Sequence, residues 1–219
     1  MYSIDITNNY THIQFKSEFK ILSSAIYNGG FCYANHFLNY KVPLNKDEKK
    51  LFEDPKITLS NVASQKKWKG STVGMMTAAT MNTCKSYQIE IDTIKIEAIV
   101  TCGLTNSRRA GDKADYQEII KENEDIGTIN IICISNIGFT QAAMVEAIMI
   151  ITEARAAILQ DLNIKSKVSQ KIATGTGTDS IAFACPNENK INFCGKHVLM
   201  GEILAKCVIN ALKKSIKEK

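Results

Sequence analysis

The polar side chains best spaced for chemistry lie in the segment Ala173–Asp179, where three threonines alternate with two glycines and an aspartate follows. Glycine lets the backbone turn tightly and come close to a ligand. The hydroxyls come from Thr174, Thr176 and Thr178, and Asp179 adds a negative charge or a general base. This pattern predicts a backbone cradle for anions or polar groups, although it matches neither a Walker A loop nor a GxGxxG loop. A hairpin turn is the competing interpretation.

A second polar segment, Val100–Asp112, begins in an apolar run. Its Arg108 and Arg109 are suited to clamp a carboxamide, phosphate or carboxylate by forked hydrogen bonds. The competing interpretation is an ion pair inside the loop, with Asp112 or Asp115. Because rigid scaffolds often present functional residues on the loops beside their strands, two such segments in a small chain predict a built site rather than ordinary turns.

Candidates for proton transfer come from one predicted helix and from the histidines. Glu146 and Glu153 are spaced by two helical turns, so they share a helix face. A solvated helix edge is the simpler interpretation, and spacing alone favours it. The alternative is a buried general base with a raised pKa, for which Glu153 is the better candidate because apolar residues crowd it. His36, after a glycine turn, is a candidate general acid or base, with a structural role as the alternative. His12 is expected to be exposed.

The composition is that of an ordinary globular chain, with 219 residues, 45% hydrophobic, 22% charged and a net charge of +5. One domain over residues 1–219 is the expectation at this length. The lysine-rich stretches indicate a solvated surface, and no aromatic-rich basic motif predicts a nucleic-acid partner. Charged residues interrupt the most apolar stretch, residues 139–159, so we expect a buried helix there and no membrane span.

The seven cysteines include no CxxC pair, and no zinc spacing occurs among cysteine and histidine. We therefore expect buried thiols in a reducing cytosol, hence a cytoplasmic protein, and no metal site. The N-terminal residues lack the pattern of a signal peptide. The apolar helices would permit a homodimer.

Apolar patterns predict the elements that must position these side chains. Strands are expected at residues 13–15, 19–27, 72–79, 86–92, 94–101, 128–134, 171–174 and 180–185. Helices are expected at 47–53, 57–66, 140–162 and 198–216, with a loop or short helix at 113–126. Because strands are grouped on either side of one long helix, we expect an α+β fold. It would be a mixed, largely antiparallel sheet packed by the long buried helix and the amphipathic C-terminal helix.

Seven blocks of sequence occur in a defined order. They are Asn28-Gly29-Gly30 with Asn35-His36, Gly74–Ala79, Val100–Asp112, Gly127–Ile132, Ile151–Ala157, Ala173–Asp179 and Gly195-Lys196-His197. Taken together, they resemble the adenosylcobinamide amidohydrolase family, and the resemblance extends from about residue 20 to residue 212. Two departures are Cys102, where a small residue such as alanine is expected, and Arg155, where lysine is usual.

The resemblance implies hydrolysis of the amide that links the aminopropanol arm to the corrin ring of adenosylcobinamide. The products would be adenosylcobyric acid and aminopropanol, in a corrinoid-salvage step of archaea and some bacteria. The cobalt corrinoid is then the substrate, and no cofactor is expected. For this reaction we assign Glu153 or Asp179 as base and His36 as proton donor, with Thr178 as a possible nucleophile. The expected substrate-binding residues are Asn35, Thr101, Asn106, Arg109, Asp112, Asn130, Thr174, Thr176 and Thr178.

Two other classes of function fit the same segments. One is a corrinoid-binding or nucleotide-binding module without catalysis, in which the threonine and glycine segment only grips amides or phosphate. The other is an amidase for a different small molecule. Substrate binding without turnover would favour the first, and hydrolysis of other amides would favour the second.

Overall fold

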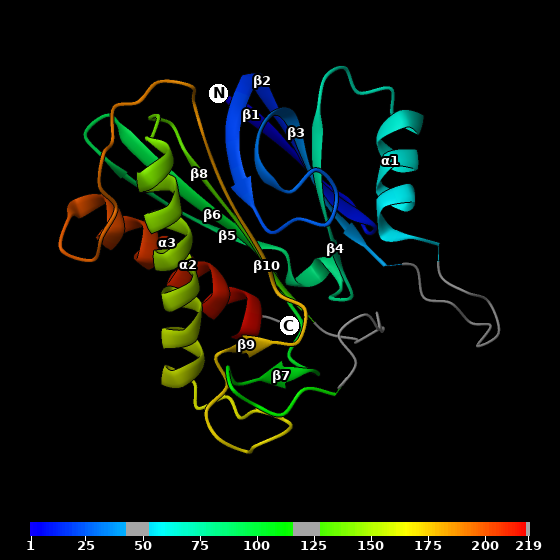
Figure 1. Cartoon of the computed structure of the whole chain (residues 1–219), viewed down its shortest axis with the longest axis vertical. Coiled ribbons are helices and arrows are strands. Elements are labelled where there is room, and N and C mark those ends of the chain that lie inside the picture. Colours follow the sequence, from blue (N-terminus) through cyan, green and yellow to red (C-terminus); the bar gives the residue numbers. More distant parts are fainter. Residues whose placement is uncertain (43–52, 116–127, 218–219) are drawn as a thin grey trace.

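The structure, a computed structural model, describes residues 1–42, 53–115 and 128–217. Figure 1 shows helices α2 (Gln141–Asp161) and α3 (Leu199–Lys217) together on one side of a large sheet. Helix α1 (Pro55–Gln65) lies at the opposite end of the molecule, beside strand β4 (Thr72–Thr77). A single helical turn, η1 (Met81–Thr83), follows β4.

Eight of the described strands form one mixed sheet in the order β4-β3-β2-β10-β8-β6-β5, with β1 paired to β2 outside this path. The pairs β3–β4 and β8–β10 are parallel, and the other pairs in this sheet are antiparallel. Strands β7 and β9 form a separate two-stranded sheet. The remaining bounds are β1 (Tyr2–Ile6), β2 (Tyr10–Ser23), β3 (Gly30–Lys41), β5 (Lys85–Ile91), β6 (Ile94–Cys102), β7 (Ser107–Arg108), β8 (Ile129–Ser135), β9 (Gly175–Thr176) and β10 (Ser180–Cys185).

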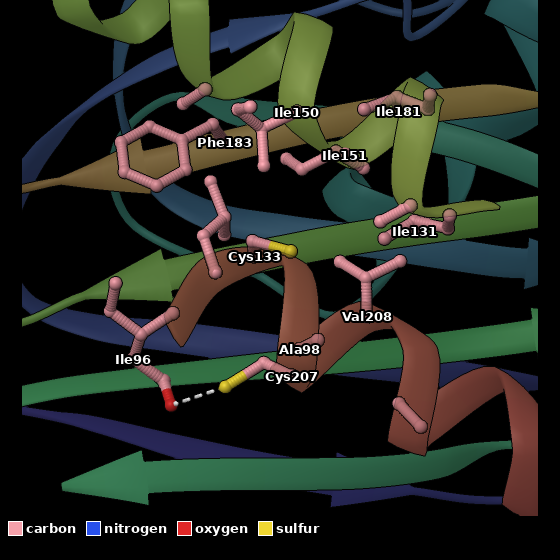
Figure 2. Close-up of a cluster of buried hydrophobic side chains, with 14 of the residues drawn as sticks. Ile96, Ala98, Ile131, Cys133, Ile150, Ile151, Ile181, Phe183, Cys207 and Val208 are labelled. Atoms are coloured by element: carbon pink, nitrogen blue, oxygen red, sulfur yellow. Dashed lines mark hydrogen bonds between the residues drawn. The ribbon is translucent and has the colours of Figure 1, made fainter. Parts of the chain in front are cut away.

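The larger core lies between one face of the sheet and the two long helices. Figure 2 shows Cys133 of β8 and Phe183 of β10 among Ile150 and Ile151 of α2 and Val208 of α3. All five side chains are buried in one apolar cluster. Removing this apolar surface from water is the main force that holds the helices on the sheet.

The other face of the central strands is covered by the sheet itself. Phe37 of β3 and Met75 of β4 share a buried cluster with Ile99 of β6, Ile132 of β8 and Ala184 of β10. The sheet therefore curls back over its own middle, so β8 and β10 are buried on both faces. Burial on both faces explains why consecutive side chains of the strand predicted at 128–134 are apolar, with Ile131 and Cys133 in one cluster and Ile132 and Ile134 in the other.

The predicted fold class is confirmed, because the sheet is mixed and largely antiparallel and packs against a long buried helix and a C-terminal amphipathic helix. The predicted helices 57–66, 140–162 and 198–216 match α1, α2 and α3 within a few residues. Caps set two of these starts: Asp54 accepts from the Lys56 amide at 2.7 Å, and Thr140 accepts from the Ala143 amide at 3.3 Å.

Predictions for the first forty residues were less accurate. The two short strands expected at 13–15 and 19–27 are one long strand, β2, whose pairing with β3 shifts register between Gln14 and Phe19. Strands β1 and β3 were not predicted. Polar side chains interrupt the apolar pattern of β3, and their burial depends on partners from other strands.

Three other predictions concern the segments 171–174, 47–53 and 113–126. Residues 171–174 form no strand, because Ile172 makes only an isolated bridge with Lys165. The helix predicted at 47–53 lies almost wholly outside the described residues, as does most of the segment 113–126.

Candidate active site

The two polar segments predicted to form a site come together in the structure. Strands β7 and β9 pair antiparallel, beside the C-terminal half of α2 (Figure 1). The Thr174 amide donates to the Arg108 carbonyl at 2.8 Å, and the Gly177 amide donates to the Asn106 carbonyl at 3.1 Å. The Ala110 amide donates to the Thr174 hydroxyl at 2.8 Å. These bonds join the two segments into one wall.

An open pocket of about 650 Å³ lies against this wall. It is lined by Arg108, Arg109, Ala110, Asp112, Lys113, Ala114, Asp115, Arg155, Thr174, Gly175, Thr176, Gly177, Thr178 and Asp179. Four basic and three acidic side chains are among them, so the lining is nearly balanced in charge. Such a lining offers donors and acceptors to a polar neutral group, and it offers little net attraction to a polyanion.

Asp179 braces the threonine and glycine turn. Its Oδ1 accepts from the Ile129 amide at 3.0 Å and from the Thr176 hydroxyl. Its Oδ2 accepts from the Thr176 amide at 2.9 Å and pairs with Nη1 of Arg155 at 2.7 Å. The carboxylate thus ties the start of β8, the turn and α2 together, and its side chain is only 8% exposed.

Gly175 is a glycine because this ion pair lies directly over it. A Cβ at this position would meet Oδ2 of Asp179 at 2.2 Å and Cζ of Arg155 at 3.1 Å. The sequence predicted a close approach to the glycine backbone. In the structure, the group that approaches Gly175 is the protein's own ion pair.

The rim of the pocket is held by Asp112. Its Oδ2 accepts from the Arg109 amide at 2.7 Å and from the Ser166 hydroxyl. Hydrogen bonds from Ser166 and Ser169 hold the pKa of Asp112 below its usual value. Arg109 itself donates to the Ile172 carbonyl at 2.9 Å.

The neighbouring arginine fits the simpler interpretation of the pair. Arg108 forms an ion pair with Asp115, and its Nε donates to Oδ1 of Asn106 at 3.0 Å. Asn106 is 8% exposed, and its amide nitrogen has no hydrogen-bond partner within the described part of the chain. It is therefore a buried donor close to the pocket wall.

Glu153 does not lie in the pocket. Its side chain is 48% exposed and forms an ion pair with Lys196, which is 71% exposed. Helix α2 buries the face that carries Ile151 and Ala154, and Glu153 points away from that face. The expectation of a buried, crowded carboxylate is therefore wrong, and the solvated helix edge was the correct alternative.

His12 and His36 lie in strands β2 and β3, in the N-terminal half of the sheet, and outside the pocket lining. His36 is in the middle of β3 rather than beside a turn, and it is 3% exposed. Its Nε2 donates to the Lys69 carbonyl at 2.9 Å, and its Nδ1 lies 3.1 Å from Nε2 of His12. His12 is buried, contrary to expectation, and its ring stacks on Trp68 with centroids 3.7 Å apart. Burial and the neighbouring His36 lower the pKa of His12 to about 4.

Four predicted substrate-binding residues are also outside the pocket lining, namely Asn106, described above, and Asn35, Thr101 and Asn130. Thr101 and Asn130 are 0% and 2% exposed, inside the sheet, so they are not surfaces for a ligand. Asn35 packs against Gly70, whose φ of +100° places its Hα side against the Asn35 amide. Asn35 thus belongs to the region of the histidines. Six other predicted site residues do line the pocket: Asp179, Arg109, Asp112, Thr174, Thr176 and Thr178.

Sequence reasoning missed Arg155 as a site residue, and it noted only that lysine is usual there. The guanidinium uses Nε for the Thr174 carbonyl at 3.0 Å and Nη1 for Asp179. A charged side chain in the middle of an apolar helix was the available signal. Ser166, which holds Asp112, carried no signal in the sequence.

Comparison with known proteins places the chain in a family of hydrolases. Residues 2–219 match the family model described as adenosylcobinamide amidohydrolase, and the chain belongs to that family. The uncharacterized protein MJ1613 of Methanocaldococcus jannaschii is 34% identical over 211 residues, which cover 90% of this chain and 81% of that protein.

Two solved structures show weaker likenesses. The PH0078 protein from Pyrococcus horikoshii OT3 aligns with a TM-score of 0.43 and 10% identity, over 98% of this chain and 78% of that chain. The L-aminopeptidase D-Ala-esterase/amidase from Ochrobactrum anthropi aligns with a TM-score of 0.41 and 9% identity, over 98% and 82%. Both likenesses are too weak to carry conclusions about chemistry.

Two further features of the described residues concern ligands and membranes. No group of three or more His, Cys, Asp or Glu side chains there is arranged to hold a metal ion. None of the described helices is both long enough and apolar enough to cross a membrane.

Proposed function

We propose that this protein hydrolyses the amide between the aminopropanol arm and the corrin ring of adenosylcobinamide, giving adenosylcobyric acid and aminopropanol. Membership of the family supports this reaction. The observation that carries it to a site is the polar pocket, which is built from the two family blocks 100–112 and 173–179. The corrinoid is the substrate in this proposal, no cofactor takes part, and the reaction takes place in the cytoplasm as part of corrinoid salvage.

The pocket suits the amide-fringed edge of a corrinoid. We place the scissile amide and the aminopropanol arm inside this open pocket of about 650 Å³ and the corrin ring across its opening. Carboxamides need a donor and an acceptor side by side, and a lining of threonine hydroxyls, arginines and aspartates offers both. The nearly balanced charge favours this neutral edge over a nucleotide phosphate.

Amide hydrolysis needs an attacking oxygen, a stabilised oxyanion and a proton for the leaving amine. The Thr176 hydroxyl donates to Asp179, which is the arrangement of a hydroxyl with a neighbouring carboxylate base. We assign Thr176 and Asp179 to the reacting end. Asp179 accepts the proton of the attacking oxygen, which is the Thr176 hydroxyl or a water bound to it, and returns that proton to the nitrogen of aminopropanol as the C–N bond breaks. If Thr176 attacks, a water then hydrolyses the threonyl ester and releases adenosylcobyric acid. Arg109, Asp112 and Thr174 are assigned to the substrate rim. Glu153 and His36 are left out, because neither lines the pocket.

The test is incubation of purified protein with adenosylcobinamide, followed by mass spectrometry for adenosylcobyric acid and aminopropanol. We expect both products in the presence of wild-type protein, none with D179N, and near-normal amounts with E153Q. Tight binding of adenosylcobinamide without product would instead indicate a binding module. Hydrolysis of other amides without a response to corrinoids would indicate a different amidase.

A further inference from the structure

Buried polar side chains connect the curled halves of the sheet. The Asn39 amide nitrogen on β3 donates to the Thr101 hydroxyl on β6 at 3.0 Å. The Asn130 amide nitrogen on β8 donates to Oδ1 of Asn39 at 2.8 Å and to the Met76 carbonyl at 2.8 Å. Asn39, Thr101 and Asn130 are all less than a tenth exposed.

Thr128 lies between this network and the pocket wall. Its hydroxyl, on a residue 4% exposed, lies 2.7 Å from the Thr178 carbonyl and 3.1 Å from Oδ1 of Asn130. A hydroxyl has one proton, and the shorter contact assigns it to the Thr178 carbonyl, so Thr128 packs against the Asn130 amide without donating to it. One residue along the chain, the Ile129 amide donates to Asp179. The turn that carries Thr176 is therefore held by hydrogen bonds from two consecutive residues, Thr128 and Ile129.

The position of this network is informative because polar groups are costly to bury. Ile99, Phe37 and Ile132 surround the same space, so apolar side chains would fill it without hydrogen bonds. Each buried amide or hydroxyl needs a partner to offset its lost hydration. Hydrogen bonds have a direction that apolar contacts lack, and the Thr128 hydroxyl directs one of them at the turn.

We propose that Thr128 is a positioning residue, which fixes the Thr178 carbonyl and so holds Thr176 and Asp179 in the reactive geometry. The proposal rests on the proposed function, because it assigns this residue to the same reaction.

The first experiment compares T128V with T128S in steady-state kinetics on adenosylcobinamide. Valine keeps the shape of the side chain and removes the donor, whereas serine keeps the donor. We expect kcat to fall about 10-fold to 100-fold in T128V with KM changed less than about 2-fold, since small misplacements of reacting groups act mainly on the chemical step. T128S is expected to restore most of kcat.

The matched control is T11V. Thr11 is another buried threonine in the same space, and its hydroxyl lies 3.1 Å from the Cys84 thiol rather than near the turn. We expect T11V to lower thermal stability by a similar amount while kcat stays within about 2-fold of wild type. If T11V and T128V lose kcat equally, the role of Thr128 is only structural and the proposal is wrong.

A second readout does not depend on turnover. Amide hydrogen exchange of the peptide that contains residues 174–179 should become faster in T128V and remain unchanged in T11V. If T128V does not fold, T128A is the second variant for both measurements. Wild-type turnover with unchanged kcat and unchanged exchange in the Thr128 variants would overturn this inference alone, whereas absence of turnover in the wild type would overturn the proposed function.

Discussion

At the scale of single residues, the side chain of Arg155 fits the threonine and glycine turn at residues 174–179. Its planar guanidinium binds the Thr174 carbonyl through Nε and Asp179 through Nη1 at the same time. A lysine ammonium is a compact point charge and lacks this forked geometry. The departure from the usual lysine therefore strengthens the connection between α2 and the turn.

Replacing Gly175 by alanine should break that connection. The added Cβ would lie 2.2 Å from Oδ2 of Asp179, so the ion pair with Arg155 must move. We expect G175A to lower the free energy of unfolding by about 1–3 kcal/mol and to reduce product formation, measured by urea denaturation and the mass-spectrometric assay. The control is G74A, whose Cβ meets the methyl groups of Leu59 at 3.2 and 3.3 Å and Cβ of Tyr27 at 3.4 Å, and no ion pair. An equal loss of activity in both variants would argue against a special role for the turn.

The Thr176 hydroxyl gives a second prediction at this scale. T176V keeps the size of the side chain and removes the group that donates to Asp179. We expect turnover of adenosylcobinamide to fall about 100-fold or more in T176V and to persist in T176S. Normal turnover in T176V would assign the reaction to another hydroxyl, with Thr178 the next to replace.

At the scale of elements, hydrogen bonds from Lys20 connect strand β2 to the loop before α2 and to the loop after β10. Lys20 is 3% exposed, and its ammonium donates to the Phe139 carbonyl at 2.5 Å, the Glu188 carbonyl at 3.0 Å and Oδ1 of Asn189 at 2.7 Å. All three donors of the ammonium are thereby used. This clamp holds the loop before α2 and the loop after β10 on the same strand.

Substituting this lysine should destabilise the fold through the loops. K20M leaves the three oxygen acceptors without their donor, so we expect the free energy of unfolding to fall by about 2 kcal/mol or more. K16M is the control, because Lys16 is an exposed residue of the same strand. Urea denaturation of both variants gives the comparison, and equal midpoints would show that the clamp adds nothing to stability.

At the scale of the whole molecule, the histidine cluster makes folding depend on pH. His12 has a pKa near 4 in the folded protein, against 6.5 as its ordinary value. Between these values the unfolded chain binds a proton that the folded chain does not, so the free energy of unfolding falls as pH decreases from about 6.5 towards 4. The contribution is complete above pH 6.5 and amounts to at most about 3 kcal/mol.

The single tryptophan reports on this transition, because Trp68 stacks on His12. We expect wild-type stability, followed by Trp68 fluorescence in urea, to decrease between pH 6.5 and pH 4 more steeply than the stability of H12Q. H197Q, a change at an exposed histidine, should behave like wild type. Identical slopes for wild type and H12Q would contradict the assignment. The hydrogen bonds of Asp112 affect stability in a lower pH range. They lower the pKa of its carboxyl group, so their contribution to stability is lost only as the pH falls below the ordinary pKa of 3.8.

The sequence alone determined the parts of the fold with a strong local pattern. Helices α2 and α3 and the apolar strand β8 follow from hydrophobic periodicity, and the two polar segments predicted a site that the structure assembles. The ordered blocks also identified the family that the chain matches. These properties depend on patterns of residues that are close together in the sequence, so the sequence is enough to predict them.

Tertiary structure decided which polar residues face the pocket and which lie inside the protein. Glu153 lies on an exposed helix edge, whereas Asn130 is buried by a partner 91 residues away, Asn39. A polar side chain can be buried only where a distant strand supplies its hydrogen bond, and spacing along the chain contains no information about that strand. The site residues therefore became distinguishable only when the sheet curled back and brought β3 against β8.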